Sequence, residues 1–155
     1  MRSMRTLVSI ALAFAAAAVF AVPASAHPFG TAVGSLTLLN DQQTPIGQAH
    51  GNTFVHEVAA IQYTGGLSGV AAATDTVVVH ADGSIQAFGG ETCHSCTIGG
   101  RTGSFTAVFA FHSTATGITG REIFISGSGS LAGLRGGGTF EVTPAGGTYS
   151  YAYRF

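Results

Sequence analysis

The last third of the chain constrains the fold more than any other part. Across residues 99–155, four short runs rich in β-branched and aromatic residues alternate with clusters of glycine. Runs of this kind, bounded by glycine, predict antiparallel strands joined by turns. We therefore expect an all-β protein.

The N-terminus has the layout of a secretory signal peptide. Two arginines precede an apolar run at residues 7–22 that contains one polar residue, Ser9, and the small residues 24–26 follow a proline. A transmembrane anchor is the alternative, but the run is short for a span of about 20 residues. We expect residues 1–26 to be removed at the small-x-small site, so that residues 27–155 are secreted as one β-barrel domain.

Charge excludes several classes of partner. The sequence has no lysine, and the expected mature chain carries four arginines and seven acids, a net charge of −3. Nucleic acid requires a basic patch, which this composition does not supply. Anionic membrane surfaces are equally poor partners after signal cleavage. The many valine, isoleucine, phenylalanine and tyrosine residues argue against disorder.

The mature chain reads as eight strands with short turns. Asp82-Gly83 lies between two β-prone runs and is a strong hairpin signal. The polar segment 40–52 predicts a loop, Gly89-Gly90 predicts the end of the fourth strand, and residues 131–134 predict a single helical turn. We expect strands at residues 32–39, 53–63, 68–80, 85–88, 101–113, 120–128, 138–143 and 148–155.

Eight short strands without a long helix predict a closed barrel or a two-sheet sandwich. The fifth and last strands each place aromatic residues on one face and small or polar residues on the other. This pattern suits a small antiparallel barrel whose large side chains fill the interior or line a cavity. The candidate ligand-binding residues are these aromatic side chains: Phe105, Phe109, Phe111, Tyr149, Tyr151 and Tyr153.

The same segment carries a family resemblance. It contains G-R-x-G-S-F at residues 100–105, a histidine at 112, and G-x-G-x-L-x-G-L-x-G at residues 127–136. A Thr-Phe strand and G-T-Y-x-x-x-Y at residues 147–153 follow. The segment resembles an uncharacterised bacterial family of small barrels like that of allene oxide cyclase. The resemblance implies an eight-stranded antiparallel barrel that is distantly lipocalin-like. It does not imply any particular activity. The missing lysines, the signal peptide and the Cys93–Cys96 segment depart from the family pattern.

Cys93 and Cys96 form a C-x-x-C motif that has three interpretations. A redox-active dithiol requires a thioredoxin-like setting with a helix, and this chain predicts none. A zinc site requires more ligands than two cysteines and His94. We favour a small structural disulfide, which an exported protein can keep.

His27 becomes the first residue after signal cleavage. A terminal amine with its own imidazole, completed by a second histidine, is a copper-binding arrangement. The alternative is that cleavage falls there by chance. His27 is thus a weak metal candidate, and no metal or other cofactor is expected. P-loop, dinucleotide and nucleophile-elbow motifs are absent from the sequence.

Three polar residues are weak catalytic candidates. Glu57 shares a strand face with apolar neighbours, so it is either a general base or ligand anchor with a raised pKa, or an acid that faces water or pairs with an arginine. His112 ends an aromatic strand and is either a catalyst or a histidine on the barrel rim. Tyr151 is a possible polar group for positioning a substrate.

Three functions remain open. The first is a barrel that binds a small apolar molecule in an aromatic-lined cavity. The second is a cyclase or isomerase that holds a reactive substrate in one conformation. The third is a structural protein that packs against copies of itself as a homo-oligomer. A cavity favours the first two, and a buried carboxylate or histidine inside it favours the enzyme.

Overall fold

A computed structural model describes residues 29–155. This part of the chain is entirely β-structure and turns. Within it, no helix is long and apolar enough to cross a membrane. The strands are β1 (Gly30–Ala49), β2 (Asn52–Gly65), β3 (Leu67–Val79), β4 (Ile85–Ile98), β5 (Arg101–Thr114), β6 (Gly117–Gly129), β7 (Arg135–Thr143) and β8 (Gly146–Arg154).

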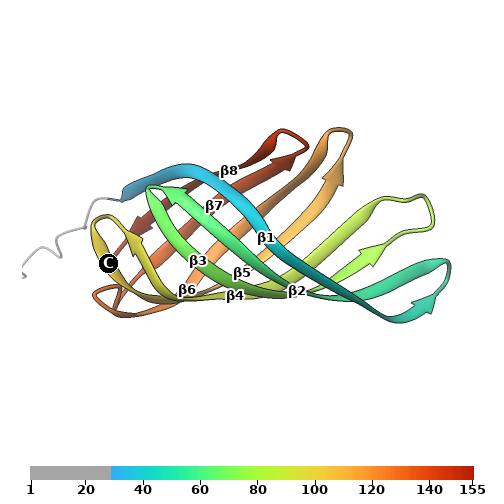
Figure 1. The fold of residues 1–155 in the computed structure, drawn as a ribbon, viewed down its shortest axis with the longest axis horizontal. Coiled ribbons are helices and arrows are strands. Elements are labelled where there is room, and N and C mark those ends of the chain that lie inside the picture. Colours follow the sequence, from blue (N-terminus) through green and yellow to red (C-terminus); the bar gives the residue numbers. More distant parts are fainter. Residues whose placement is uncertain (1–28) are drawn as a thin grey trace, which may run out of the picture.

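Each strand pairs antiparallel with the next one along the chain, and β1 also pairs with β8. The eight strands therefore form a closed barrel (Figure 1), as the sequence predicts. The β2–β3, β4–β5 and β6–β7 turns lie at one end, which we call the closed end. The β1–β2, β3–β4, β5–β6 and β7–β8 turns lie at the other, which we call the open end.

The closed end is filled by a hydrophobic core. Its fully buried side chains come from strands on all sides of the barrel and from the β6–β7 turn. Aromatic rings meet edge to face within it, with centroids 5.2 Å apart for Phe105 and Phe124, and 5.5 Å apart for Phe124 and Tyr151. The largest members are Tyr63, Leu67, Ile98, Phe105, Phe124, Leu131, Leu134 and Tyr151.

The β6–β7 turn differs from its prediction. Residues 131–134 form reverse turns rather than a helical turn, with Ala132 N donating to Gly129 O at 3.2 Å and Leu134 N to Leu131 O at 3.0 Å. Gly133 has a φ of 86°, a left-handed conformation that interrupts a right-handed helix. The turn places Leu131 and Leu134 in the core.

Two predicted breaks are wrong. Residues 40–49 are not a loop but the second half of β1, which pairs with β2 as far as Ala49. Gly89-Gly90 does not end the fourth strand, because β4 continues to Ile98. A Cβ at Gly89 would overlap the backbone of Thr74 and Asp75, so this glycine serves close packing against β3.

The Asp82-Gly83 hairpin is confirmed. His80 N donates to Ser84 O at 2.8 Å, and Gly83 N donates to His80 O at 2.9 Å. Gly83 has a φ of 83°, which glycine adopts without strain. Ser84 N also donates to Asp82 Oδ1 at 2.9 Å.

The barrel has a seam between β1 and β8. Their pairing runs from Gly30 opposite Tyr153 to Leu36 opposite Gly147, and β1 then continues with β2 as its only neighbour. Figure 1 shows the β1–β2 hairpin projecting beyond the barrel. We use the word seam below for the place where β1 leaves β8.

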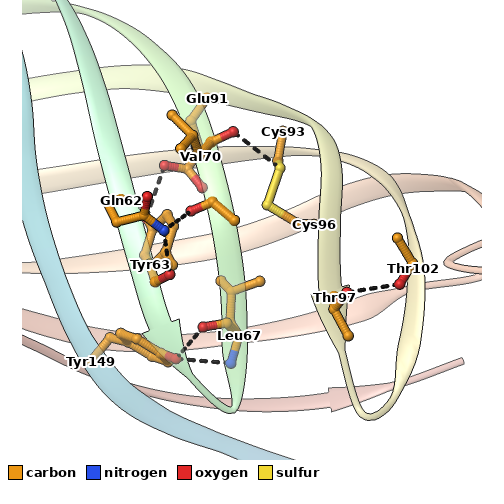
Figure 2. The surroundings of a disulfide bond; sticks show 11 residues. Gln62, Tyr63, Leu67, Val70, Glu91, Cys93, Cys96, Thr97, Thr102 and Tyr149 are labelled. Carbon is orange, nitrogen blue, oxygen red and sulfur yellow. Dashed lines mark hydrogen bonds between the residues drawn. A yellow bond between two sulfur atoms is a disulfide. The ribbon is translucent and has the colours of Figure 1, made fainter.

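Cys93 and Cys96 are joined by a disulfide across an irregularity in β4. Their Cα atoms lie 5.9 Å apart and both residues are fully buried (Figure 2). The motif sits in a strand, where no helix N-terminus is available to lower a thiol pKa. The arrangement therefore agrees with the structural interpretation.

Reducing this disulfide is expected to lower the free energy of unfolding by about 2 kcal/mol, the chain-entropy value for a loop of this size. Urea denaturation with and without a phosphine reductant measures the difference. The Cys93→Ala/Cys96→Ala double variant is the control, since its midpoint should not respond to the reductant. Equal midpoints for the oxidised and reduced native protein would contradict the prediction.

Candidate ligand-binding cavity

A cavity of about 240 Å³ occupies the barrel between the closed-end core and the open end. It exists because alanines at positions 59 and 73 and glycines at 146 and 147 leave room opposite larger side chains. Its remaining walls are mainly aliphatic and aromatic. They comprise Leu36, Thr37, Leu38, Glu57, Ile61, Tyr63, Asp75, Glu91, Phe109, Phe111, Ile118, Glu122, Phe140 and Val142.

The cavity extends to the seam. Leu36, Thr37 and Leu38 of β1 face Gly146 and Gly147 of β8 across it. Beyond Leu36 these strands are no longer joined by backbone hydrogen bonds. The β1–β8 ladder thus ends at the edge of the cavity, where β8 begins at Gly146.

Three phenylalanines form an aromatic wall. Phe109 and Phe111 of β5 are stacked with centroids 6.3 Å apart. Phe140 of β7 meets both of them nearly edge on, at 6.5 and 6.4 Å. The wall presents ring faces and edges to the cavity, which suits an apolar or aromatic ligand.

Two buried glutamates lie at the inner end of the cavity. Glu91 of β4 and Glu122 of β6 are 3 % and 2 % exposed. The Tyr63 hydroxyl donates to Glu91 Oε2 at 2.9 Å and lies 3.4 Å from Glu122 Oε2. The Tyr151 hydroxyl donates to Glu122 Oε2 at 2.6 Å. Tyr63 thus bridges the two carboxyl groups, and Tyr151 binds the carboxyl group of Glu122.

The environment favours protonation of this pair. Burial raises the pKa of Glu91 well above its ordinary value, and repulsion from Glu122 adds to the shift. Burial also raises the pKa of Glu122, but the hydrogen bond from Tyr151 opposes that shift. Glu91 is therefore the member that keeps its proton to higher pH. Paired carboxyls with separated pKa values are able to act as an acid and a base.

A second acidic pair lies nearer the open end. Glu57 of β2 and Asp75 of β3 are directly opposite each other in the sheet. Gln43 Nε2 donates to Glu57 Oε2 at 2.8 Å and to Asp41 Oδ2 at 3.0 Å. Burial, followed by the charges of Glu57 and Asp41, raises the pKa of Asp75 to about 7. Burial and Asp41 also raise the pKa of Glu57.

Three cavity carboxyls each have one buried oxygen without a hydrogen-bond partner in residues 29–155: Asp75 Oδ2, Glu91 Oε1 and Glu122 Oε1. No cation compensates them. The four arginines in this part of the chain have exposed side chains and do not line the cavity. A buried unsatisfied polar atom is costly, so these three oxygens are unusual and need an explanation.

The sequence-predicted residues divide between cavity, core and surface. Glu57, Phe109 and Phe111 line the cavity, and Tyr151 contacts its inner glutamate. Phe105 and Tyr149 are packed in the closed-end core. Tyr153 lies against Gly30 and Gly99 at the closed end, outside the cavity.

Tyr149 has a structural contact that the sequence does not reveal. Its hydroxyl accepts a hydrogen bond from Leu67 N at 2.8 Å and lies within 3.0 Å of the carbonyl oxygens of Thr64 and Leu67 (Figure 2). It thereby fastens the β2–β3 turn to β8.

The other candidates lie elsewhere. His112 is exposed on the outer face of β5, beside Arg121 and Thr119, and does not face the cavity. Residues 1–26, predicted to be a signal peptide, and His27 lie outside the described part of the chain. In residues 29–155 no three His, Cys, Asp or Glu side chains form a group able to hold a metal ion.

Four titratable cavity residues were not among the predicted sites: Tyr63, Asp75, Glu91 and Glu122. The alternation of inward and outward residues along β4 and β6 contains a signal that both glutamates point into the barrel. Glu91 shares a strand face with Cys93, and Glu122 shares one with Phe124, and both neighbours are buried. An acid at an inward position is either paired or functional. The sequence cannot show that the two glutamates meet across β5.

The Tyr151→Phe substitution is expected to lower the free energy of unfolding by about 1.5 kcal/mol, because Glu122 loses its shortest hydrogen bond while remaining buried. Urea denaturation measures the loss. Tyr153→Phe is the matched control on the same face of β8. Its hydroxyl makes no side-chain hydrogen bond within residues 29–155, so its removal should change little. Equal effects for the two variants would contradict the prediction.

The fold and the cavity define a class of protein: a small antiparallel barrel with an internal, acid-containing pocket. Residues 32–155 match the profile of a family described as protein of unknown function (DUF3224), and the chain belongs to that family.

A solved structure supports the fold. The crystal structure of a DUF3224-family protein with unknown function from Shewanella oneidensis MR-1 is similar, with a TM-score of 0.67 and 18% sequence identity. The match covers 82% of this chain and 97% of the other. No curated protein matches significantly. The likeness to allene oxide cyclase stays a prediction.

Proposed function

We propose that this protein binds a small, largely apolar molecule inside its barrel. The observation that carries the proposal is the 240 Å³ cavity behind the seam, with its wall of three phenylalanines. A purely structural barrel has no need of such a space, because side chains would fill it. Ligand pockets usually measure about 300–1,000 Å³, so the ligand is smaller than a typical drug.

The proposal places this binding outside the cytoplasm. The signal-like residues 1–26 support export, and a disulfide between Cys93 and Cys96 is the kind of bond that persists in an oxidising compartment. N-terminal sequencing of protein recovered from the periplasm or medium of an expressing bacterium tests this part. Recovery only from the cytoplasm with residue 1 intact would overturn it.

Filling the cavity tests binding. Ala73 lines it and is 1 % exposed, whereas the neighbouring Ala72 faces outward on the same strand. Ala73→Leu should abolish binding of indole, a neutral aromatic probe, followed by NMR titration. Ala72→Leu should bind it as the native protein does. Native mass spectrometry of gently purified protein should also show a co-purifying small molecule.

The binding proposal fails if neither experiment detects a ligand. It also fails if Ala73→Leu and Ala72→Leu bind indole equally, because the probe would then be on the surface. Urea denaturation of both variants shows whether either substitution has unfolded the barrel, which separates loss of the cavity from loss of the protein.

The glutamate pair favours a second candidate function, acid–base isomerisation. One carboxylate removes a proton from carbon and the other carboxylic acid returns a proton to a different atom, so that no co-reactant is consumed. Glu91 and Glu122, bridged by Tyr63, supply the two groups. Deuterium uptake by phenylacetone in D₂O is the test. Exchange no faster than in buffer, or unchanged by Glu122→Gln, would count against it.

A further inference from the structure

We propose that the cavity's ligand is an organic cation: a small amine whose ammonium group binds the buried carboxyl groups of the cavity and whose apolar body packs on the phenylalanine wall. This rests on the proposed binding function and adds the charge of the ligand.

The cavity has unused acceptors. Asp75, Glu91 and Glu122 are each less than 5 % exposed, each lines the cavity, and each has one buried oxygen without a partner in residues 29–155. An ammonium group offers several N–H donors and a positive charge. It can therefore satisfy such an oxygen in hydrogen bonds stronger than neutral ones.

The cavity has no cation of its own. The sequence contains no lysine, and Arg101, Arg121, Arg135 and Arg154 all have exposed side chains. Two of them lie over rings near the closed end, with Arg101 4.1 Å from the centroid of Phe155 and Arg154 5.4 Å from that of Phe29. When these carboxyl groups ionise inside the barrel they therefore lack a counter-ion, and a cationic ligand supplies it.

The aromatic wall suits the same ligand. Ring faces attract ammonium groups and also pack against apolar carbon. Phe109, Phe111 and Phe140 lie in the same cavity as the acids. A molecule with one charged head and one aromatic or aliphatic body meets both surfaces together.

Anionic ligands, metal ions and neutral ligands fit this cavity less well than an amine does. A fatty acid or other carboxylate would bring a fifth carboxyl group to a cavity already lined by Glu57, Asp75, Glu91 and Glu122. A bare metal ion needs several converging ligands, and no such group occurs in residues 29–155. A neutral alcohol could bond to one carboxyl but would leave the charge uncompensated.

Binding of a cation should release protons. Around the cavity, the titratable groups are Glu57 and Tyr63 on β2, Asp75 on β3, Glu91 on β4, Glu122 on β6 and Tyr151 on β8, with Asp41 on β1 near the mouth. The β5 and β7 walls contribute no titratable side chain. Because burial favours the protonated carboxyls, an arriving ammonium group displaces protons from them.

Three compounds of similar shape provide the test: phenethylamine, 2-phenylethanol and phenylacetate. They carry a positive, a neutral and a negative head. Calorimetric titration of the full chain with its disulfide intact, at pH 7, should show phenethylamine binding at least about tenfold more tightly than 2-phenylethanol, a difference of about 1.4 kcal/mol. Phenylacetate should show no binding. Repeating the amine titration in buffers of different ionisation enthalpy should reveal proton release.

Two variants complete the experiment. Glu91→Gln should weaken phenethylamine binding at least about fivefold while changing 2-phenylethanol binding less than about twofold. Glu141→Gln, at an exposed acid on β7, should leave both unchanged. If Glu91→Gln does not fold, proton release by the native protein still decides the question.

Equal affinity for the amine and the alcohol, or amine binding without proton release, would overturn the cationic ligand and leave the binding function standing. Competition by millimolar Ca²⁺ as effective as by phenethylamine would also overturn it, because the site would then respond to any cation. If none of the three compounds binds and indole does not bind either, the proposed function itself fails.

Discussion

Gly136→Ala is expected to lower the free energy of unfolding by about 3 kcal/mol, combining backbone strain with overpacking. Gly136 begins the glycine run of β7 and lies opposite Tyr153 of β8. Its φ is 136°, which disfavours any residue with a side chain. A Cβ there would also overlap the carbonyl oxygen of Ala152 and lie 2.8 Å from the Cα of Tyr153. Urea denaturation measures the loss.

Gly47→Ala is the matched control. Gly47 is an exposed strand glycine with no atom within 4 Å of its would-be Cβ and no left-handed φ. Its substitution should change the free energy of unfolding by less than about 0.5 kcal/mol. If Gly136→Ala were as stable as Gly47→Ala, the close approach of β7 and β8 would be contradicted.

The stability of the empty barrel is expected to fall as pH rises from about 4 to about 7. The pKa of Asp75 rises from 3.8 to about 7 on folding, so the folded state holds a proton that the unfolded state has released. The contribution of this proton to the free energy of unfolding is complete below the pKa of Asp75 in the unfolded chain. It is lost as the pH rises through the pKa of Asp75 in the folded protein. The raised pKa values of Glu91 and Glu122 act in the same direction.

For Asp75 alone this shift corresponds to about 4 kcal/mol. Although Asp75 is only 4 % exposed, it lines the cavity nearer the open end of the barrel and does not lie in the closed-end core. Screening there reduces the expected loss to about 2.5 kcal/mol. Asp75→Asn should therefore be more stable than the native protein at pH 8 and show a shallower decline. Urea midpoints measured from pH 4 to 8 provide the comparison.

Asp82→Asn is the control for that profile. Asp82 lies on the exposed β3–β4 turn, and hydrogen bonds from Ser84 lower its pKa rather than raise it. Its substitution should leave the decline between pH 5 and 8 in place. A native profile that is flat or rising over this interval would show that the cavity acids are ionised without cost.

The sequence predicts strands well where one face is buried. The alternating aromatic residues of β5 and β8 identify those strands and their inward faces, because period-two alternation reflects burial on one side. The prediction fails for residues 40–49, which carry Pro45 and many polar side chains. There β1 has only β2 beside it and its side chains are exposed, so no alternation arises.

Glycine is ambiguous for a related reason. Gly89-Gly90 predicts a turn by composition, yet Gly89 lies where β3 and β4 approach too closely for a side chain. The candidate site is likewise only partly predictable from the sequence. Phe109, Phe111 and Glu57 follow from alternation, whereas the meeting of Glu91 and Glu122 requires the curvature of a closed sheet. The order of residues in the sequence does not show that these two side chains are close in space.

The seam also leaves β1 with a free edge. Between residues 37 and 49 the side of β1 away from β2 has no strand beside it. Such an edge is a template for unwanted pairing between molecules. Two irregularities, between Leu38 and Asn40 and between Pro45 and Gly47, interrupt it, and Pro45 offers no N–H. The proline and polar residues that make this strand look like a loop in the sequence thus also oppose pairing of its free edge with another molecule.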